Sequence, residues 1–236
     1  EGTLTTAGGG AVTLSGATAT YVPAADYNGV DFFAYIANDG GQDSAAATVT
    51  ITIDAVNDAP TLDTLSDVTI DEDSGETLVT VTNVSVGGGD DEAAEQTVTL
   101  TAVVDDATLM YEPVVSGSGS TWTLALQPIA DANGAATVTV TVTDGGDAQS
   151  PSVATVTTTF SVTVDASNDA PSFDFVDNVS LVEDAAAADL TVTGVNAGGG
   201  DDEAGQTVYF TATSSNTSIL QDPLITGSGT TRTLTL

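Results

Sequence analysis

Residues 138–143 read Val138-Thr139-Val140-Thr141-Val142-Thr143, with an apolar and a small polar side chain alternating at every step. β-branched residues at period two are typical of a strand with one buried face. The same alternation runs through 47–53, 97–101 and 162–164, and turn-forming Gly, Asn, Asp and Ser separate the runs. No stretch shows helical spacing, and no apolar run approaches the roughly 18 residues of a membrane span. We therefore expect an all-β protein with no helices of note and no direct membrane insertion.

The charge balance and the missing residue types exclude several kinds of function. Among 236 residues there are 34 acidic side chains, one basic side chain (Arg232), no histidine and no cysteine, which gives a formal charge of -33. Such a polyanion cannot neutralise nucleic-acid phosphates, which requires clustered Lys and Arg. Without His or Cys there is no Ser-His or Cys-His nucleophile, no zinc site of the usual ligands and no disulfide. Because 41% of the residues are hydrophobic, we expect a folded chain that is not an enzyme and binds no nucleic acid.

The chain repeats itself. Residues 57–60, Asn-Asp-Ala-Pro, recur at 168–171, an offset of 111 residues (168 minus 57). The longer motif Gly-Gly-Gly-Asp-Asp-Glu-Ala at 87–93 recurs at 198–204 with the same offset. A repeat of this length matches one small domain, so the repetition predicts a tandem array.

We divide the chain at the repeated Asn-Asp-Ala-Pro motifs. Residues 1–58 are predicted to be the C-terminal half of a repeat, 59–169 a complete repeat, and 170–236 the N-terminal half of a following one. Parts of a longer array, or neighbours in a polymer, are expected to complete the halves. The complete repeat is predicted to hold seven strands, near 62–70, 77–84, 96–104, 111–116, 121–127, 135–143 and 153–165. Seven short strands over about 110 residues predict an immunoglobulin-like β-sandwich, with Trp122 in its core.

Several motifs resemble a known family. Asp39-Gly40-Gly41, the strand at 47–53 and the linker at 57–60 resemble the end of a cadherin-like repeat. The stretch at 198–217 resembles the variant found in giant bacterial surface proteins. The resemblance implies tandem seven-stranded immunoglobulin/cadherin-like sandwiches, stacked into an extracellular stalk whose junctions bind calcium. The family's linker has Asp two residues before its Asn, whereas this chain has Ala55 and Ala166 there.

Topology predicts which acidic loops meet. Successive strands of such a sandwich run in opposite directions, so its loops alternate between two ends. Ca²⁺ takes six to eight oxygen ligands, which acidic loops can supply. The lower junction, between the second and third repeats, is predicted to gather Glu72, Asp131, Asn168, Asp169, Asp201 and Asp202. The upper junction, between the first and second repeats, is predicted to gather Asp26, Asn57, Asp58, Asp90, Asp91 and Asp144.

Other interpretations stay open. Acidic residues are common in turns, and halophilic adaptation would also select acids, although it predicts them on strand faces. The preferred hypothesis is a non-catalytic, calcium-stiffened stalk or fibre segment of a bacterial or archaeal protein at the cell surface. Its partners would be neighbouring repeats of the same chain. The alternatives are a carbohydrate- or protein-binding module, and a filament subunit that self-associates through edge strands.

Overall fold

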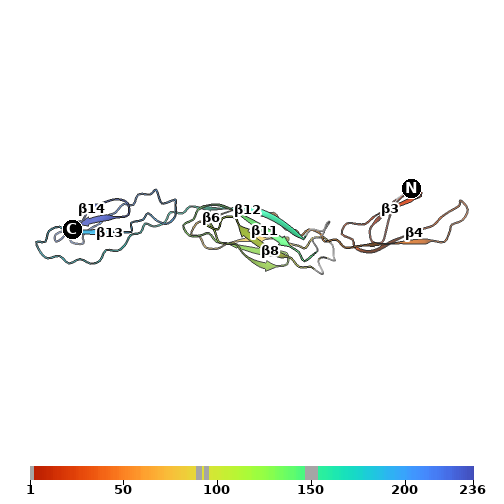
Figure 1. Ribbon diagram of the computed structural model, residues 1–236, viewed down its shortest axis with the longest axis horizontal. Coiled ribbons are helices and arrows are strands. Elements are labelled where there is room, and N and C mark those ends of the chain that lie inside the picture. Colours follow the sequence, from red (N-terminus) through yellow and green to blue (C-terminus); the bar gives the residue numbers. More distant parts are fainter. Residues whose placement is uncertain (1–2, 89–91, 93–95, 147–153) are drawn as a thin grey trace.

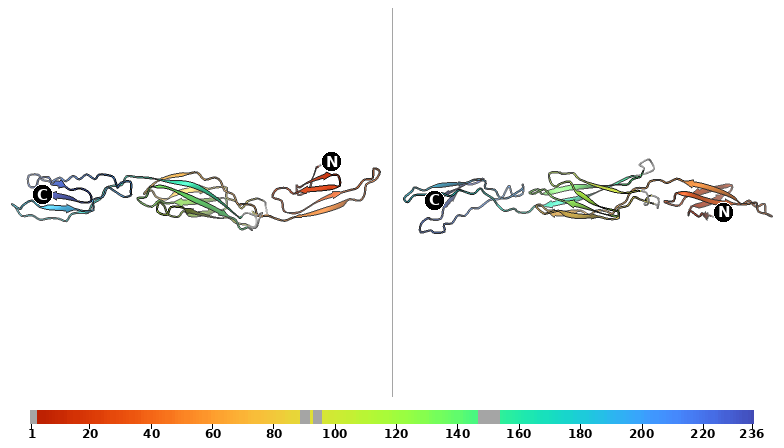
Figure 2. Two further views of the ribbon diagram at one scale, coloured as in Figure 1. Left: turned by 45° about the horizontal axis from the view of Figure 1, so that its top comes forward. Right: turned by 90° about the horizontal axis from the view of Figure 1, so that it is seen from below.

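The computed structural model describes residues 3–88, 92, 96–146 and 154–236, and its strands form three groups that lie in a row (Figure 1). The first group precedes residue 54, the middle group lies between 68 and 165, and the third follows residue 188. Two further views show the same elongated arrangement (Figure 2). The domain boundaries at residues 58 and 169 stay a prediction.

The first and third groups contain small sheets. In the first group, β1, β2 and β3 form one antiparallel sheet, and β4 pairs with β5. In the third group the strand order is β13-β15-β14. The bounds are β1 Thr3–Thr5, β2 Ala11–Ser15, β3 Thr18–Val22, β4 Gly29–Tyr35, β5 Ala47–Ile53, β13 Asp189–Val192, β14 Leu224–Thr226 and β15 Arg232–Thr235.

The middle group is a β-sandwich of two sheets. One sheet has the order β7-β10-β9, and the other has the order β6-β12-β11-β8 with β6 parallel to β12. The bounds are β6 Val68–Asp71, β7 Thr77–Val81, β8 Thr99–Val104, β9 Val114–Ser118, β10 Thr121–Leu126, β11 Gly134–Thr143 and β12 Thr155–Asp165. The all-β, immunoglobulin-like fold expected from the sequence is confirmed.

The alternation at 138–143 works as predicted. Val138, Val140 and Val142 are fully buried, because alternate side chains of β11 point into the sandwich. All sixteen residues of the buried hydrophobic cluster lie between Ile70 and Val164. Trp122 is half-buried and packs against this cluster from its margin.

One strand differs from its prediction. The first strand of the repeat was expected over 62–70, but β6 begins only at Val68. Thr61 instead pairs with Ser85, which follows β7 of the opposite sheet. The chain therefore crosses from one sheet to the other between Thr61 and Val68, and the crossing segment cannot belong to a single ladder. Over the described ranges, no helix is long and apolar enough to cross a membrane.

The first group contains a buried carboxylate. Asp31 on β4 is 1% exposed and accepts hydrogen bonds from the Tyr21 hydroxyl (2.8 Å), the Thr6 hydroxyl, and the backbone N–H groups of Gly8 (3.1 Å) and Phe32 (2.8 Å). Burial raises the pKa of Asp31, but these hydrogen bonds outweigh it and lower the pKa to about 2. The carboxylate thus ties the loop at 6–8 and β3 to β4.

We expect this tie to fail in acid. Because the folded pKa of Asp31 lies below its ordinary value of 3.8, its stabilising effect is present above that value and is lost as the pH falls towards 2. Tyr21→Phe removes one donor and should raise the pKa of Asp31, whereas Tyr35→Phe, at an exposed tyrosine of β4, should not. The carboxyl ¹³C shift of Asp31, followed by NMR against pH, measures both. Titration of Asp31 near 4 in the unaltered protein would contradict the assignment.

Candidate metal centre

Three aspartates converge at the lower junction. Asp73 follows β6, Asp131 lies between β10 and β11, and Asp169 lies in the linker after β12. Each offers a carboxylate oxygen, and these oxygens all lie within 4.8 Å of one another. Asp73 and Asp131 both have φ of 59°, a left-handed conformation that Asp tolerates better than most residues. Three loops at one end of the sandwich therefore bring like charges together.

Two buried glutamates hold the linker from opposite sides. Glu72 is 2% exposed, and its Oε1 accepts a hydrogen bond from the Ser167 N–H at 2.7 Å. Glu203, in the loop after β13, is 1% exposed, and its Oε1 accepts from the Asp169 N–H at 2.8 Å. The backbone of the linker is thus bonded to a carboxylate from the second repeat and to one from the third.

Asn133 adds a link across the junction. Its Nδ2 donates to Asp202 Oδ1 at 3.2 Å and lies 3.4 Å from Glu72 Oε2. One amide thereby connects acids of the second and third repeats.

The crowding raises two pKa values. Asp131 is exposed overall, but the crowded loops around its carboxyl partly desolvate it, and this desolvation, a hydrogen-bonding contact with Asp169, and the charges of Asp169, Asp73 and Glu72 raise its pKa. The hydrogen bond from the Asp169 N–H lowers the pKa of Glu203, but burial and the charges of Asp202, Asp169 and Glu72 outweigh it and raise the pKa. Both shifts have the sign expected for carboxylates that lack a compensating cation.

The donor set fits a hard cation. Asp169 Oδ2 and Glu203 Oε2 are buried and have no hydrogen-bond partner among the described residues, although buried polar atoms are normally paired. Every side-chain atom that could bind a metal here is an oxygen. Oxygen ligands suit Ca²⁺ and not a metal that prefers nitrogen or sulfur. The residues that could hold the ion are Glu72, Asp73, Asp131, Asn133, Asp169, Asp202 and Glu203.

A glycine turn closes against the cluster. A Cβ at Gly199 would overlap the carboxylate of Asp131, and a Cβ at Gly198 would lie 2.7 Å from Asp169 Cβ. The turn therefore approaches the acids more closely than a side chain would allow, which accounts for the repeated Gly-Gly-Gly motif.

The upper junction repeats these contacts. Glu92 Oε1 accepts a hydrogen bond from the Asp58 N–H at 2.6 Å, which corresponds to the Glu203–Asp169 bond at an offset of 111 (203 minus 92). A Cβ at Gly88 would lie 2.7 Å from Asp58 Oδ2 and 3.0 Å from Asp26 Oδ1. Both junctions are therefore built on the same plan.

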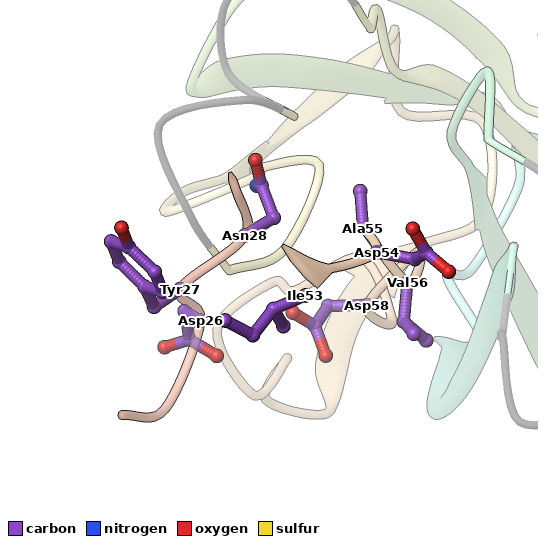
Figure 3. Close-up of a pocket in the computed structure, with 8 residues that line it drawn as sticks. All are labelled: Asp26, Tyr27, Asn28, Ile53, Asp54, Ala55, Val56 and Asp58. Carbon is purple, nitrogen blue, oxygen red and sulfur yellow. The ribbon is translucent and has the colours of Figure 1, made fainter. Parts of the chain in front are cut away.

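A cavity of about 200 Å³ lies beside the upper linker and is lined by Asp26, Asn28, Asp54 and Asp58, among others. The carboxylates of Asp26 and Asp58 lie in the lower half of the view, whereas the Asp54 carboxylate lies to the upper right and points away from them (Figure 3). Asp54 thus does not take the place of the family's linker aspartate, which Ala55 occupies. Asp54 is exposed, and so is Asp165, which holds the corresponding position at the lower junction.

The remaining predicted residues have varied positions. Asn57 Nδ2 lies 3.4 Å from both carboxylate oxygens of the buried Asp144 and donates to the Asp58 carbonyl at 3.1 Å. Asn168 Nδ2 donates to the Asp169 carbonyl, and its Oδ1 accepts from Gln206. Asp201 is exposed and borders a separate cavity of about 300 Å³ that Asp131 also lines.

The predicted set was incomplete. Asp90 and Asp91 lie outside the described residues. Three acids that it omitted contact the linkers or the cluster, namely Asp73, Glu92 and Glu203. The signal for the glutamates was present, since both stand third in the repeated Asp-Asp-Glu.

Gly199→Ala tests the close approach of the turn. Because the new Cβ would overlap Asp131, we expect that carboxylate to move and the calcium affinity that the sequence predicts for this junction to fall by about tenfold, since affinity depends on the number of charged ligands. Gly205→Ala, in the same loop and with open space around its Cβ, is the matched control. Calcium titration by calorimetry measures both, and equal affinities would contradict the geometry.

The family-model comparison agrees with the immunoglobulin-like fold. Residues 1–52 match the family model of the bacterial Ig domain. The titin Z1Z2 domains, solved in complex with telethonin, share 17% identity, with 77% of this chain and 82% of that chain covered and a TM-score of 0.35. Domains 4 and 5 of the S-layer protein SbsC share 17% identity, with coverages of 58% and 65% and a TM-score of 0.30. A search of curated proteins found no match. The chain is thus an all-β protein of immunoglobulin-like architecture that is similar, over its first 52 residues, to bacterial Ig domains.

Proposed function

We propose that this chain is a structural segment of a bacterial extracellular surface protein, in which calcium at the junctions holds immunoglobulin-like repeats in a row. The match of residues 1–52 to bacterial Ig domains supports the structural class. The row of strand groups supports a role in spacing (Figure 1).

The observation that carries the calcium proposal is a pair of buried oxygens at the lower junction that have no hydrogen-bond partner in the part of the chain that the structure describes. Asp169 Oδ2 and Glu203 Oε2 are withdrawn from water, and the oxygens of Asp73, Asp131 and Asp169 gather within 4.8 Å. Asp73 and Asp131 are exposed and Asp169 is half-buried, so water screens part of the repulsion between them, and the screening is weakest at the two buried oxygens. A bound divalent cation would supply the missing positive charge.

The residues around the ion would have distinct tasks. Asp131 and Asp169 would contribute carboxylate oxygens directly. Glu203 would keep its Oε1 on the Asp169 N–H and offer its Oε2, so that one side chain both orients the linker and neutralises the ion. Binding would thereby couple the backbone direction of the linker to the third repeat. The same Glu-to-linker bond at Asp58 supports a second site of this kind at the upper junction.

Calcium should raise the unfolding temperature of the chain. Extracellular calcium modules bind at roughly 10⁻⁴–10⁻³ M, so an ion concentration about 100-fold above the dissociation constant should add about 2.7 kcal/mol per site. Differential scanning calorimetry and small-angle scattering, with calcium or with EDTA in excess, measure the stability and the extension. Identical melting curves and scattering profiles under the two conditions would rule the metal out.

Asp169→Ala should affect calcium binding at the junction without lowering the stability of the sandwiches themselves. Without calcium the variant should melt no lower than the parent, because one repelling charge is gone, but its calcium-induced rise should shrink and its inter-repeat angle should loosen. Asp165→Ala, an exposed acid near the same linker, should leave both unchanged. If Asp169→Ala keeps the affinity and the scattering profile of the parent, the linker is a plain spacer.

A further inference from the structure

A cavity recurs at one end of two repeats. In the middle sandwich, a cavity of about 430 Å³ lies between the tip of the β9–β10 hairpin and residues 84–86 and 96–98. In the third repeat, a cavity of about 440 Å³ lies under the β14–β15 hairpin. Corresponding residues line the two cavities, for example Val84 and Val195, an offset of 111 (195 minus 84). The cavity is therefore a feature of the repeat, and its volume falls within the usual range of ligand sites.

The two cavities differ at one position. Trp122 and Arg232, the only tryptophan and the only arginine of the chain, occupy equivalent places at an offset of 110 (232 minus 122). Trp122 Nε1 donates to the Gly119 carbonyl at 3.0 Å, and Arg232 Nη1 donates to the Gly229 carbonyl at 2.8 Å. Each side chain thus donates a hydrogen bond to the carbonyl at its own hairpin tip. Trp122 gives its cavity an aromatic wall, whereas Arg232 gives the equivalent cavity a cationic one.

The Trp122 cavity has the chemistry of a neutral, amphipathic site. The ten lining residues that the structure describes are all uncharged, in a chain of net charge -33. Val84 and Val98 line the cavity together with Trp122, and Trp122 packs against the hydrophobic core, which holds the ring in place. Gln96 Oε1 is buried with no hydrogen-bond partner among the described residues. A suitable ligand must bring a hydrogen-bond donor, an apolar face and no negative charge.

We propose that the Trp122 cavity binds a neutral sugar residue. The C–H face of a pyranose would pack on the indole ring, and one of its hydroxyls would donate to Gln96 Oε1. Serine hydroxyls at the hairpin tip, Ser118 and Ser120, could accept or donate further hydrogen bonds. The third repeat, with Arg232 and Glu203 in the equivalent cavity, would not bind the same ligand. None of the lining residues named for this cavity is among those proposed to hold calcium, so the sugar proposal is separate from the proposed junction function.

The single tryptophan makes the test direct. The full chain is titrated with D-glucose, D-galactose, D-mannose and N-acetyl-D-glucosamine, in calcium and in EDTA, while Trp122 fluorescence is recorded. At least one sugar should give a saturable change with a dissociation constant on the order of 1 mM, as expected for so small a ligand. D-glucuronate should bind more weakly than D-glucose because it is anionic. No saturable change with any of the four neutral sugars, or equal binding of glucuronate, overturns the proposal.

Gln96→Leu locates the site. The substitution keeps the size of the side chain and the fluorescence of Trp122, and it should weaken sugar binding about tenfold or more, since the hydroxyl loses its acceptor. Gln127→Leu, at an exposed glutamine outside the cavity, is the matched control. The unfolding temperature of each variant shows that the sandwich is intact. Unchanged affinity in a folded Gln96→Leu protein overturns the assignment.

Discussion

Repulsion between carboxylates that have almost no cations to pair with is the constraint on which the rest of this structure depends. With 34 acidic side chains and one arginine, acidic loops that approach one another bring like charges together. The sandwich avoids this conflict along its length, because valines fill the interior and threonines cover much of the strand faces. Among the described residues, the acids Asp73, Asp131 and Asp169 meet at the end of the sandwich.

The junctions are organised around the backbone of the linker. At each one, a glutamate from the following repeat accepts a hydrogen bond from the linker aspartate, Glu92 from Asp58 and Glu203 from Asp169. The side chain of that aspartate is then free to approach the other acids. Pro60 and Pro171 come two residues later and restrict the chain to extended geometry. At the lower junction, the backbone of this short linker is thereby held by hydrogen bonds to Glu72 of one repeat and to Glu203 of the next.

The turns at the ends of the repeats are adapted to close approach. Asp26 and Asp131 occupy equivalent places in two repeats and share the left-handed conformation, with φ of 56° and 59°. Opposite them lie Gly88 and Gly199, whose missing side chains leave room for the carboxylates. The glycine and the aspartate of each pair thus depend on each other, although they belong to different repeats.

The sequence by itself determined the class of fold and the repeat. Val-Thr alternation specifies strands locally, and the offset of 111 between the two Asn-Asp-Ala-Pro motifs can be read without coordinates. The strand count of the middle repeat was therefore predictable, and so were Glu72, Asp131 and Asp169 as acids of the lower junction. The start of β6 was not, because the crossing between sheets at Thr61 to Val68 depends on a partner elsewhere in the chain.

Only the tertiary structure decided which acid of the Asp-Asp-Glu motif at 201–203 becomes buried. The glutamate reaches the linker N–H, while Asp201 stays exposed, because the turn directs successive side chains differently and local sequence does not specify that direction. The offset of 110 relates Trp122 to Arg232 in the sequence, but only the structure shows that both side chains donate a hydrogen bond to a hairpin carbonyl. Local patterns determine which residues form strands, whereas the meeting of loops from separate repeats determines which charges share a site.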